Sequence, residues 1–391
     1  MSRPCAILLA LACAVSPVTI ATAASPGDAG SCVSSVPFTA GTEGYHTFRI
    51  PAVMRTRFGT VLAFAEARRD SAGDTGAIAV VSKASHNGGC TWGPLSVVSS
   101  NGEATAGNPS PVVTWNGDIV LLTTRNGRVT EKQIMSGAAS EADTRRVFVQ
   151  RSTDDGRTWS VARDITADTK AANWRWYATG PGHAIVLQRG LHAGRIVVPA
   201  NHSSAPPEGS PDVGTEAKYY GGHAIISDDG GRTWRIGFTD GPLDGIIAPN
   251  ESTVAELPNG VLYFNARNQG SAAPHRVDAY SSDGGESLDA PYVVQTTLVT
   301  PKVEGSVLPV RGALLYSGPS QPNARAAMRI RVSRNRGATW VDVYSVSALP
   351  AAYSDLVQLD PATIGLLYET GTAGPYETIA FQRIPLREVL P

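Results

Sequence analysis

Seven polar residues stand out because each is expected at the end of a strand or in a loop beside one. They are Arg49, Asp74, Glu251, Arg267, Arg325, Tyr353 and Glu369. Arginine side chains bind carboxylates through paired hydrogen bonds, and carboxyl or phenol groups can exchange protons with a substrate. Taken singly, each residue is also explained as a solvated, ion-paired or core side chain. Anion binding and acid–base chemistry therefore require a fold that brings the seven together.

A repeated eight-residue motif indicates the kind of fold. The pattern S-x-D-x-G-x-T-W is intact at residues 152–159 and 227–234, and weaker copies begin at residues 85, 281 and 333. The weaker copies carry Asn87 or Asn335 in place of Asp, or Leu288 in place of Trp. We expect the Asp or Asn to accept hydrogen bonds from turn amides and the Trp to pack between neighbouring repeats.

A second repeat gives the number of units. A turn followed by an apolar strand recurs six times, and the Asn-Gly pairs at residues 116–117 and 259–260 are typical of two-residue hairpins. With a spacing of roughly 60 residues, the repeats predict an all-β fold, a six-bladed β-propeller of four-stranded antiparallel blades. The last unit lacks a fourth strand, which residues 34–39 can supply.

This topology places the two kinds of feature on opposite faces. In each blade the first strand starts and the second strand ends at one face, while the third strand ends at the other. The repeated motifs follow third strands, so neither catalysis nor calcium binding is expected of them. The seven polar residues belong to the first face, where the inner strands surround one axis and a pocket can form.

The ordered motifs of the chain resemble those of the sialidases, or neuraminidases, of the Asp-box type. The resemblance covers essentially the whole chain after residue 24 and rests on FRIP, EARRDSAGD, NES with FNAR, PNARAAMRIRVSRNRGATW, AYSDL and LLYE. It implies a retaining exo-α-sialidase that removes terminal sialic acids from glycoproteins, glycolipids and oligosaccharides. It also implies that no metal or organic cofactor takes part.

The resemblance assigns a role to each candidate residue. Arg49, Arg267 and Arg325 match the arginines that hold the substrate carboxylate, and Arg68 matches a further substrate contact. A separate set carries the chemistry: Tyr353 as nucleophile, Glu251 as its base, Asp74 as general acid/base and Glu369 as the support of Arg49. Sialic acid bears a carboxylate on its anomeric carbon, so an attacking Asp or Glu would be repelled by a like charge. A tyrosine hydroxyl is neutral and avoids this repulsion.

Other parts of the pocket and other functions stay open. Further candidates to line the pocket are Trp174, Trp176, Tyr177, Asn201, Tyr219, Tyr220 and Glu304. A trans-sialidase would use the same catalytic residues with a sugar acceptor. A non-catalytic sialoglycan-binding propeller would need only the three arginines, so the presence of nucleophile, base and acid disfavours it.

The start of the chain predicts export. Residues 1–24 have the charge, apolar run and small residues of a secretory signal peptide, with a lipoprotein signal at Cys13 as the less favoured alternative. Residues 25–391 then form one secreted catalytic domain, expected to be a monomer. Of the cysteines, Cys32 and Cys90 remain after cleavage, and they form either one disulfide or two free thiols.

Charge argues against two classes of partner. The chain has 33 Lys and Arg residues against 34 Asp and Glu residues, a net charge of −1, without a basic block. Nucleic acid and anionic membrane surfaces are therefore not expected as partners. Sialylated glycans are expected as substrates because the resemblance implies them.

Overall fold

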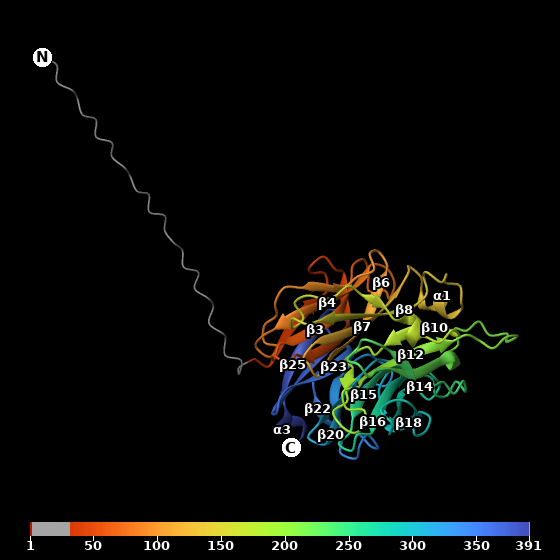
Figure 1. Ribbon diagram of the computed structural model, residues 1–391. Helices are drawn as coiled ribbons and strands as arrows, with labels where there is room; N and C mark the ends of the chain where they lie inside the picture. Colours follow the sequence, from red (N-terminus) through yellow and green to blue (C-terminus); the bar gives the residue numbers. More distant parts are fainter. Residues whose placement is uncertain (2–31, 391) are drawn as a thin grey trace.

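The computed structural model describes Met1 and residues 32–390, and these residues form a β-propeller of antiparallel sheets (Figure 1). The predicted signal peptide lies outside the described residues apart from Met1. The inner strands contact one another in the order β2, β6, β10 with β11, β15, β19 and β23, and β23 contacts β2. The sheets therefore close into a ring around one axis.

Hydrogen bonding groups the strands into five sheets instead of the six separate sheets that were predicted. Four of the sheets have four or five strands and the fifth has eight. The eight-stranded sheet consists of β2 (Thr47–Arg55), β3 (Val61–Arg68), β4 (Ile78–Ser85), β5 (Ser96–Ser99), β6 (Thr105–Val113), β7 (Ile119–Asn126), β8 (Arg146–Ser152) and β9 (Arg163–Asp164). Its two halves are joined by a single parallel pair, Ile78 with Thr105.

The other four sheets follow in chain order. They consist of β10 (Trp174–Thr179), β11 (Ile185–Val186), β12 (Ile196–Ser204), β13 (Tyr220–Ser227) and β14 (Arg235–Asp240); β15 (Pro249–Glu256), β16 (Leu262–Asn268), β17 (His275–Ser281) and β18 (Val293–Val299); β19 (Ser306–Val310), β20 (Ala313–Pro319), β21 (Met328–Ser333) and β22 (Val341–Ser345); and β23 (Ala351–Asp360), β24 (Thr363–Thr370), β25 (Thr378–Pro385) and β1 (Ser34–Thr39).

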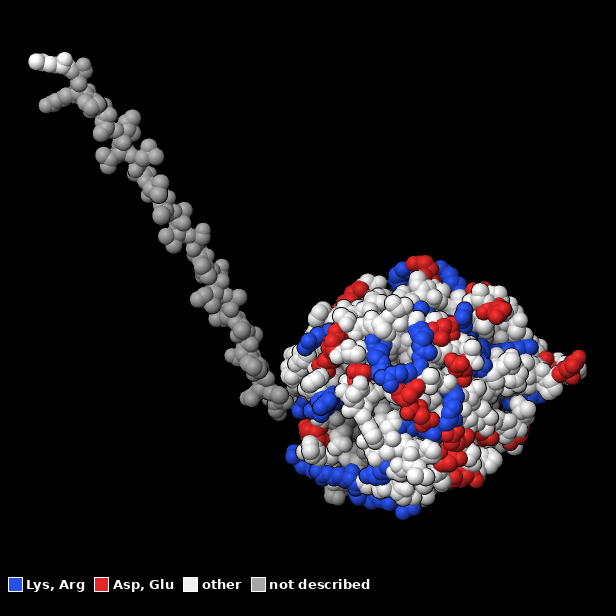
Figure 2. All heavy atoms as spheres, in the orientation of Figure 1, with Lys and Arg blue, Asp and Glu red and all other residues white. Residues whose placement is uncertain are grey.

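Helices are short and lie between strands or at the end of the chain. They are α1 (Glu131–Met135), α2 (Thr166–Thr169), the 3-10 helix η1 (Ala217–Tyr219) and α3 (Leu386–Val389). None of the helices in the described part of the chain is long and apolar enough to cross a membrane. On the face that Figure 2 shows, basic and acidic side chains are interspersed over most of the surface.

The repeated motifs form turns, as predicted. In the second copy the Asp154 carboxylate accepts a hydrogen bond from the backbone N–H of Thr158 (2.9 Å), and Ser152 Oγ accepts one from Gly156 N–H (2.9 Å). The Trp residues pack between repeats: Trp159, which follows β8, lies edge-on to Phe64 of β3 in the other half of the eight-stranded sheet, with ring centroids 6.1 Å apart. The motifs therefore stabilise turns and join neighbouring blades.

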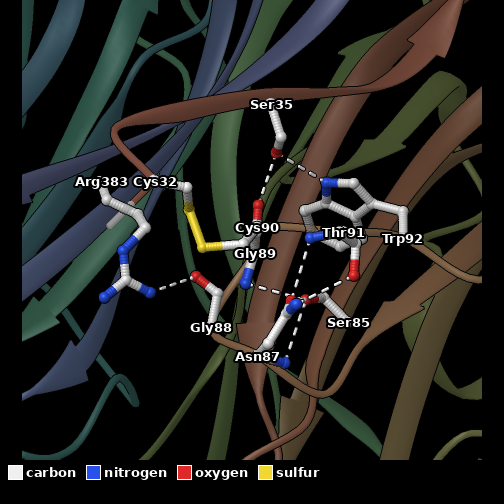
Figure 3. Close-up of a disulfide and its surroundings, with 10 residues drawn as sticks. All are labelled: Cys32, Ser35, Ser85, Asn87, Gly88, Gly89, Cys90, Thr91, Trp92 and Arg383. Carbon is white, nitrogen blue, oxygen red and sulfur yellow. Dashed lines mark hydrogen bonds between the residues drawn. A yellow bond between two sulfur atoms is a disulfide. The ribbon is translucent and has the colours of Figure 1, made fainter. Parts of the chain in front are cut away.

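The N-terminal strand completes the last sheet, as predicted. β1 pairs antiparallel with β25, so the two ends of the described chain meet in one sheet. Cys32 forms a disulfide with Cys90, which lies in the first motif turn, so of the two alternatives the structure has the bridge (Figure 3). Trp92 Nε1 donates to Ser35 Oγ beside it (2.8 Å). The disulfide therefore ties the closing strand to the first blade.

The inner strands carry β-bulges near their first residues. In β2 the register shifts between Arg49 and Ala52, and Ile50 has a φ of 57°, in the left-handed region. Pro51 lies inside this bulge, on an edge strand that pairs only with β3, so its missing N–H costs no ladder hydrogen bond. Similar shifts occur in β6, β15 and β23. Bulges bend a strand and redirect its side chains, which prepares the site described next.

Candidate active site

A cavity of ≈380 Å³ lies where the bulged ends of the inner strands meet. Seven of the eight predicted site residues line it: Arg49, Arg68, Asp74, Glu251, Arg267, Arg325 and Tyr353. The eighth, Glu369, is completely buried and contacts Arg49. The fold thus brings together residues that are up to 320 positions apart in the sequence.

Tyr353 and Glu251 form a close pair in the cavity. Tyr353 lies in the bulge of β23, and its hydroxyl donates to the Glu251 carboxylate, 2.6 Å from each oxygen. Glu251 lies in the corresponding bulge of β15. Burial raises the pKa of the Tyr353 phenol well above its usual value, and the nearby Glu251 charge raises it further. The tyrosine is therefore neutral in the free protein, with a proton acceptor in place.

Three arginines surround the Tyr353 side chain. Arg267 Nη1 lies 3.2 Å from the Tyr353 hydroxyl and 2.8 Å from Glu251 Oε2. The guanidinium carbons of Arg49 and Arg325 lie 5.1 and 5.5 Å from the centre of the Tyr353 ring. The three guanidinium groups thus converge on one part of the cavity, as an anion-binding site requires.

Glu369 fixes the direction of Arg49. Its carboxylate accepts hydrogen bonds from Arg49 Nε (3.1 Å) and Nη2 (3.3 Å). The same carboxylate accepts from the backbone N–H groups of Ile50 (2.8 Å) and Tyr353 (3.1 Å). One buried carboxylate therefore holds the bulges of β2 and β23 and the guanidinium between them.

Asp74 lies in an exposed loop at the cavity and is paired with two arginines. Its Oδ1 is 2.7 Å from Arg68 Nη1 and 3.5 Å from Arg49 Nη1. Burial alone would raise the pKa of the Asp74 carboxyl, but the two guanidinium charges outweigh it and hold that pKa below its usual value. In the free protein Asp74 is therefore ionised.

Glu66 belongs to the site but was not predicted. It accepts from Arg68 Nη2 (2.6 Å) and from the backbone N–H of Asn108 in the β6 bulge (2.9 Å). Glu66 thus holds Arg68 and the β6 bulge by hydrogen bonds, just as Glu369 holds Arg49 and the β2 bulge. Both glutamates come near the end of the second strand of their repeat, so a comparison of the apolar repeats could have found Glu66.

Arg145 is a second residue that sequence analysis missed. Its guanidinium donates to Asn126 Oδ1 (2.7 Å) and Asn108 Oδ1 (2.8 Å) and lies 4.1 Å from the Trp176 ring centre. Burial lowers the pKa of Arg145 to about 10, so it remains charged at neutral pH. Arg145 follows a long connection between β7 and β8, where no periodic pattern marks it.

Glu131 forms the neighbouring part of the wall. It lies on α1 and accepts a hydrogen bond from the Tyr220 hydroxyl. Burial raises the pKa of the Glu131 carboxyl above its usual value. Tyr220 was a candidate to line the pocket, but it is not among the residues that line the cavity; its hydroxyl donates to Glu131, which does line it.

Of the seven further residues proposed for the lining, only Trp176 lines the cavity. Trp174 and Tyr177 belong to a buried cluster between strands β6–β8 and the sheet formed by β10–β14, because a register shift in β10 between them interrupts the alternation of faces. The others lie elsewhere: Asn201 is buried in β12, Tyr219 donates to Asp212, and Glu304 is buried beneath Ser354. The predictions for these residues were wrong.

Comparison with known proteins defines the class of the protein. Residues 59–366 match the family described as BNR repeat-like domain, which is more than half of the chain. The chain is 31% identical to the exo-alpha-sialidase of Aspergillus fumigatus, over 89% of this chain and 86% of that protein. By fold and sequence the chain is a BNR-repeat propeller, and within that class it belongs to the sialidase family.

Solved structures agree with this assignment. The microbial sialidase Hz136 superposes with a TM-score of 0.74 at 26% identity, covering 90% of this chain and 68% of that one. The intramolecular trans-sialidase from Ruminococcus gnavus superposes with a TM-score of 0.74 at 20% identity, covering 91% of this chain and 98% of that one. The second likeness concerns the fold alone.

Proposed function

We propose that this protein is an exo-α-sialidase that cleaves terminal α-linked sialic acids from glycoconjugates with retention of configuration. The observation that carries the proposal is the Tyr353–Glu251 pair at the centre of three arginines. A binding protein for the same sugar needs the arginines, but it has no use for a phenol hydrogen-bonded to a carboxylate.

The arginines select and orient the substrate. Sialic acid carries a carboxylate on its anomeric carbon, and guanidinium groups bind carboxylates with a fixed plane. Each charge-assisted hydrogen bond contributes on the order of 1.5 to 3 kcal/mol. A carboxylate held by Arg49, Arg267 and Arg325 would place the anomeric carbon beside the Tyr353 hydroxyl.

Two steps complete the reaction. In the first, the Tyr353 oxygen forms a bond to the anomeric carbon, the phenol proton passes to Glu251, and the bond to the leaving oxygen breaks as Asp74 protonates it. In the second, Asp74 removes a proton from water as the water oxygen attacks the anomeric carbon, the bond from that carbon to the Tyr353 oxygen breaks, and the released phenolate regains its proton from Glu251. Two inversions give overall retention.

The acid role of Asp74 requires its pKa to rise on substrate binding. In the free protein Arg68 and Arg49 hold this pKa low. A bound substrate carboxylate would neutralise much of the charge of Arg49, and the sugar would displace water from the exposed Asp74 side chain. Both changes disfavour the ionised form and raise the pKa.

Several broader features are part of the proposal. We count the two halves of the eight-stranded sheet as two blades, which gives six blades of four or five strands. We also propose that residues 1–24 direct secretion and are removed, leaving residues 25–391 as a single catalytic domain that acts as a monomer.

Incubation of the purified protein with a fluorogenic α-sialoside tests the activity. Release of the fluorophore by the wild type, with loss in Asp74→Ala, is expected. No release by the wild type would overturn the proposal, and binding of the sugar without release would favour a non-catalytic sialoglycan-binding protein.

Hydrolysis and transfer differ in the acceptor. Adding lactose as an acceptor and analysing the products separates them, because a trans-sialidase would form sialyllactose at low acceptor concentration. An intramolecular transfer would instead give an anhydro sugar in place of free sialic acid. Free sialic acid as the main product supports hydrolysis.

A further inference from the structure

The loop between β24 and β25, residues 371–377, is folded around a carboxylate. Glu377 Oε2 accepts from Thr372 N–H (2.8 Å), and Oε1 accepts from the N–H groups of Ala373 (2.9 Å) and Gly374 (3.1 Å). A side chain at Gly371 would meet the Gly374 carbonyl oxygen at 2.3 Å and Glu377 Oε2 at 2.6 Å. The loop is therefore tightly determined, although it lies at the surface.

This loop presents Tyr376 between two of the cavity arginines. The guanidinium carbon of Arg49 lies 4.1 Å from the centre of the Tyr376 ring, and the Tyr376 hydroxyl accepts from Arg325 Nη1 at 2.7 Å. The ring also packs against the buried cluster that contains Ile50 and Tyr353. Tyr376 thus contacts both arginines through different parts of its side chain.

The hydrogen bond to the Tyr376 hydroxyl matters more for Arg325 than for the other arginines, because Arg49 and Arg267 each have a carboxylate partner. Arg49 is paired with Glu369, and Arg267 is paired with Glu251. Within residues 32–390, Arg325 forms no ion pair with a carboxylate, and its other hydrogen bond goes to the backbone carbonyl of Lys302 (3.1 Å). The Tyr376 hydroxyl is therefore the side-chain group that fixes the direction of the Arg325 guanidinium.

We propose that Tyr376 is a positioning residue for recognition of the substrate carboxylate, and that Glu377 holds it in place through the loop. The proposal rests on the proposed function. The electron-rich ring face stabilises Arg49 and separates it from Arg325, while the hydroxyl aligns Arg325. The separation matters because two cations held near one another without an intervening group would repel and turn apart.

Tyr376→Phe is the main test, because it keeps the ring and removes only the hydroxyl. The expected result is a roughly tenfold higher KM for an α-sialoside, the loss of one charge-assisted hydrogen bond, with a smaller change in kcat. Tyr280→Phe is the matched control: its hydroxyl donates to the Arg336 carbonyl, away from the cavity. It should leave both constants unchanged.

A direct binding measurement separates positioning from general damage. The probes are the 2,3-unsaturated sialic acid and its methyl ester, measured by calorimetry. Tyr376→Phe should weaken the acid by about the same factor as it raises KM and leave the weak binding of the ester unchanged. In an Arg325→Lys background Tyr376→Phe should add little. Glu377→Gln should reproduce the selective loss for the acid through the loop.

The outcomes are distinguishable. If the wild type cleaves the sialoside while Tyr376→Phe binds the acid as the wild type does, the inference is overturned and the function stands. Equal weakening of acid and ester would also overturn it, since that pattern indicates a disturbed cavity. If the wild type binds the acid but cleaves nothing, the function fails while the acid-selective effect of Tyr376→Phe supports the inference.

Discussion

At the scale of single residues, the Tyr353 hydroxyl is where the proposed chemistry begins. Its distance of 2.6 Å from both Glu251 oxygens makes the carboxylate an immediate proton acceptor. Tyr353→Phe keeps the ring against Arg49 and Arg325 but removes the nucleophile. We expect kcat to fall by at least about 100-fold, with the melting temperature nearly unchanged.

Steady-state kinetics on a fluorogenic sialoside, alongside thermal unfolding, provides the measurement. Binding of the unsaturated acid should persist in Tyr353→Phe, because the three arginines remain. A variant with wild-type kcat would show that another group attacks the anomeric carbon.

The site residues that lie in recognisable motifs were predicted, including Asp74 and Arg325 in loops, whereas Glu66 in β3 and residues in long or irregular connections were missed. Arg49, Arg267 and Tyr353 come at or beside strand ends with strong local patterns, so the repeat places them correctly. Arg145 and Tyr376 belong to connections whose paths depend on contacts such as those of Glu377. Such paths arise from tertiary hydrogen bonds, and no periodicity records them.

At the scale of elements, the sheet formed by β10–β14 contains a buried histidine pair that links stability to pH. His202 of β12 and His223 of β13 face each other with their Nδ1 atoms 3.1 Å apart, and the Trp174 ring of β10 stacks on His202 at 3.7 Å. Burial lowers the pKa of His202 to about 3 and that of His223 well below its usual value. Both rings are therefore neutral in the folded protein.

The sign of the pH effect follows from these pKa values. Unfolded histidine has a pKa of about 6.5, so below this pH the unfolded state binds protons that the folded state does not. As the pH is lowered from 6.5 towards the folded pKa, the free energy of unfolding should fall by about 1.4 kcal/mol per pH unit for each histidine. Trp176 of β10 lines the cavity, so activity should be lost when this sheet unfolds at low pH.

Denaturant unfolding at pH 7 and pH 4.5 tests this prediction. His223→Asn should remove roughly half of the loss in the free energy of unfolding between pH 7 and pH 4.5 that this pair causes. His46→Gln, at an exposed position, should leave that loss as in the wild type. The same slope in His223→Asn as in the wild type would contradict the assignment of the effect to this pair.

The elements also show where sequence patterns end. Turn motifs and apolar repeats predicted the order of the strands and the role of residues 34–39. The bulges were not predicted, because an extra residue in a strand has no characteristic amino-acid type. The Ile50-Pro51 pair in β2 is the one sequence cue. The bulge in β10 moved Trp174 and Tyr177 from the expected pocket into the core.

At the scale of the whole molecule, ring closure depends on β1 and the Cys32–Cys90 disulfide. The bridge joins residues 58 positions apart and ties β1, which completes the sheet of β23–β25, to the turn after β4. Loop-closure entropy predicts a stabilisation of about 4 kcal/mol for a loop of this length. Reduction should therefore lower the melting temperature markedly.

Thermal unfolding with and without dithiothreitol measures this contribution. Cys90→Ser should melt at the temperature of the reduced wild type and should not respond to the reductant. Activity at 25 °C should persist in both, because the motif turns lie on the face opposite the cavity. A wild type whose melting temperature ignores the reductant would refute the closing role of the bridge.

The proposed mechanism requires that Tyr353 forms a covalent bond to the anomeric carbon of sialic acid. A fluorinated sialosyl donor with a good leaving group slows the second step, so the intermediate can be trapped, digested and mapped by mass spectrometry. We expect one sialosyl group on the peptide that contains Tyr353 and none in Tyr353→Phe. A label on Glu251 or Asp74, or turnover of the donor with no label at all, would contradict it.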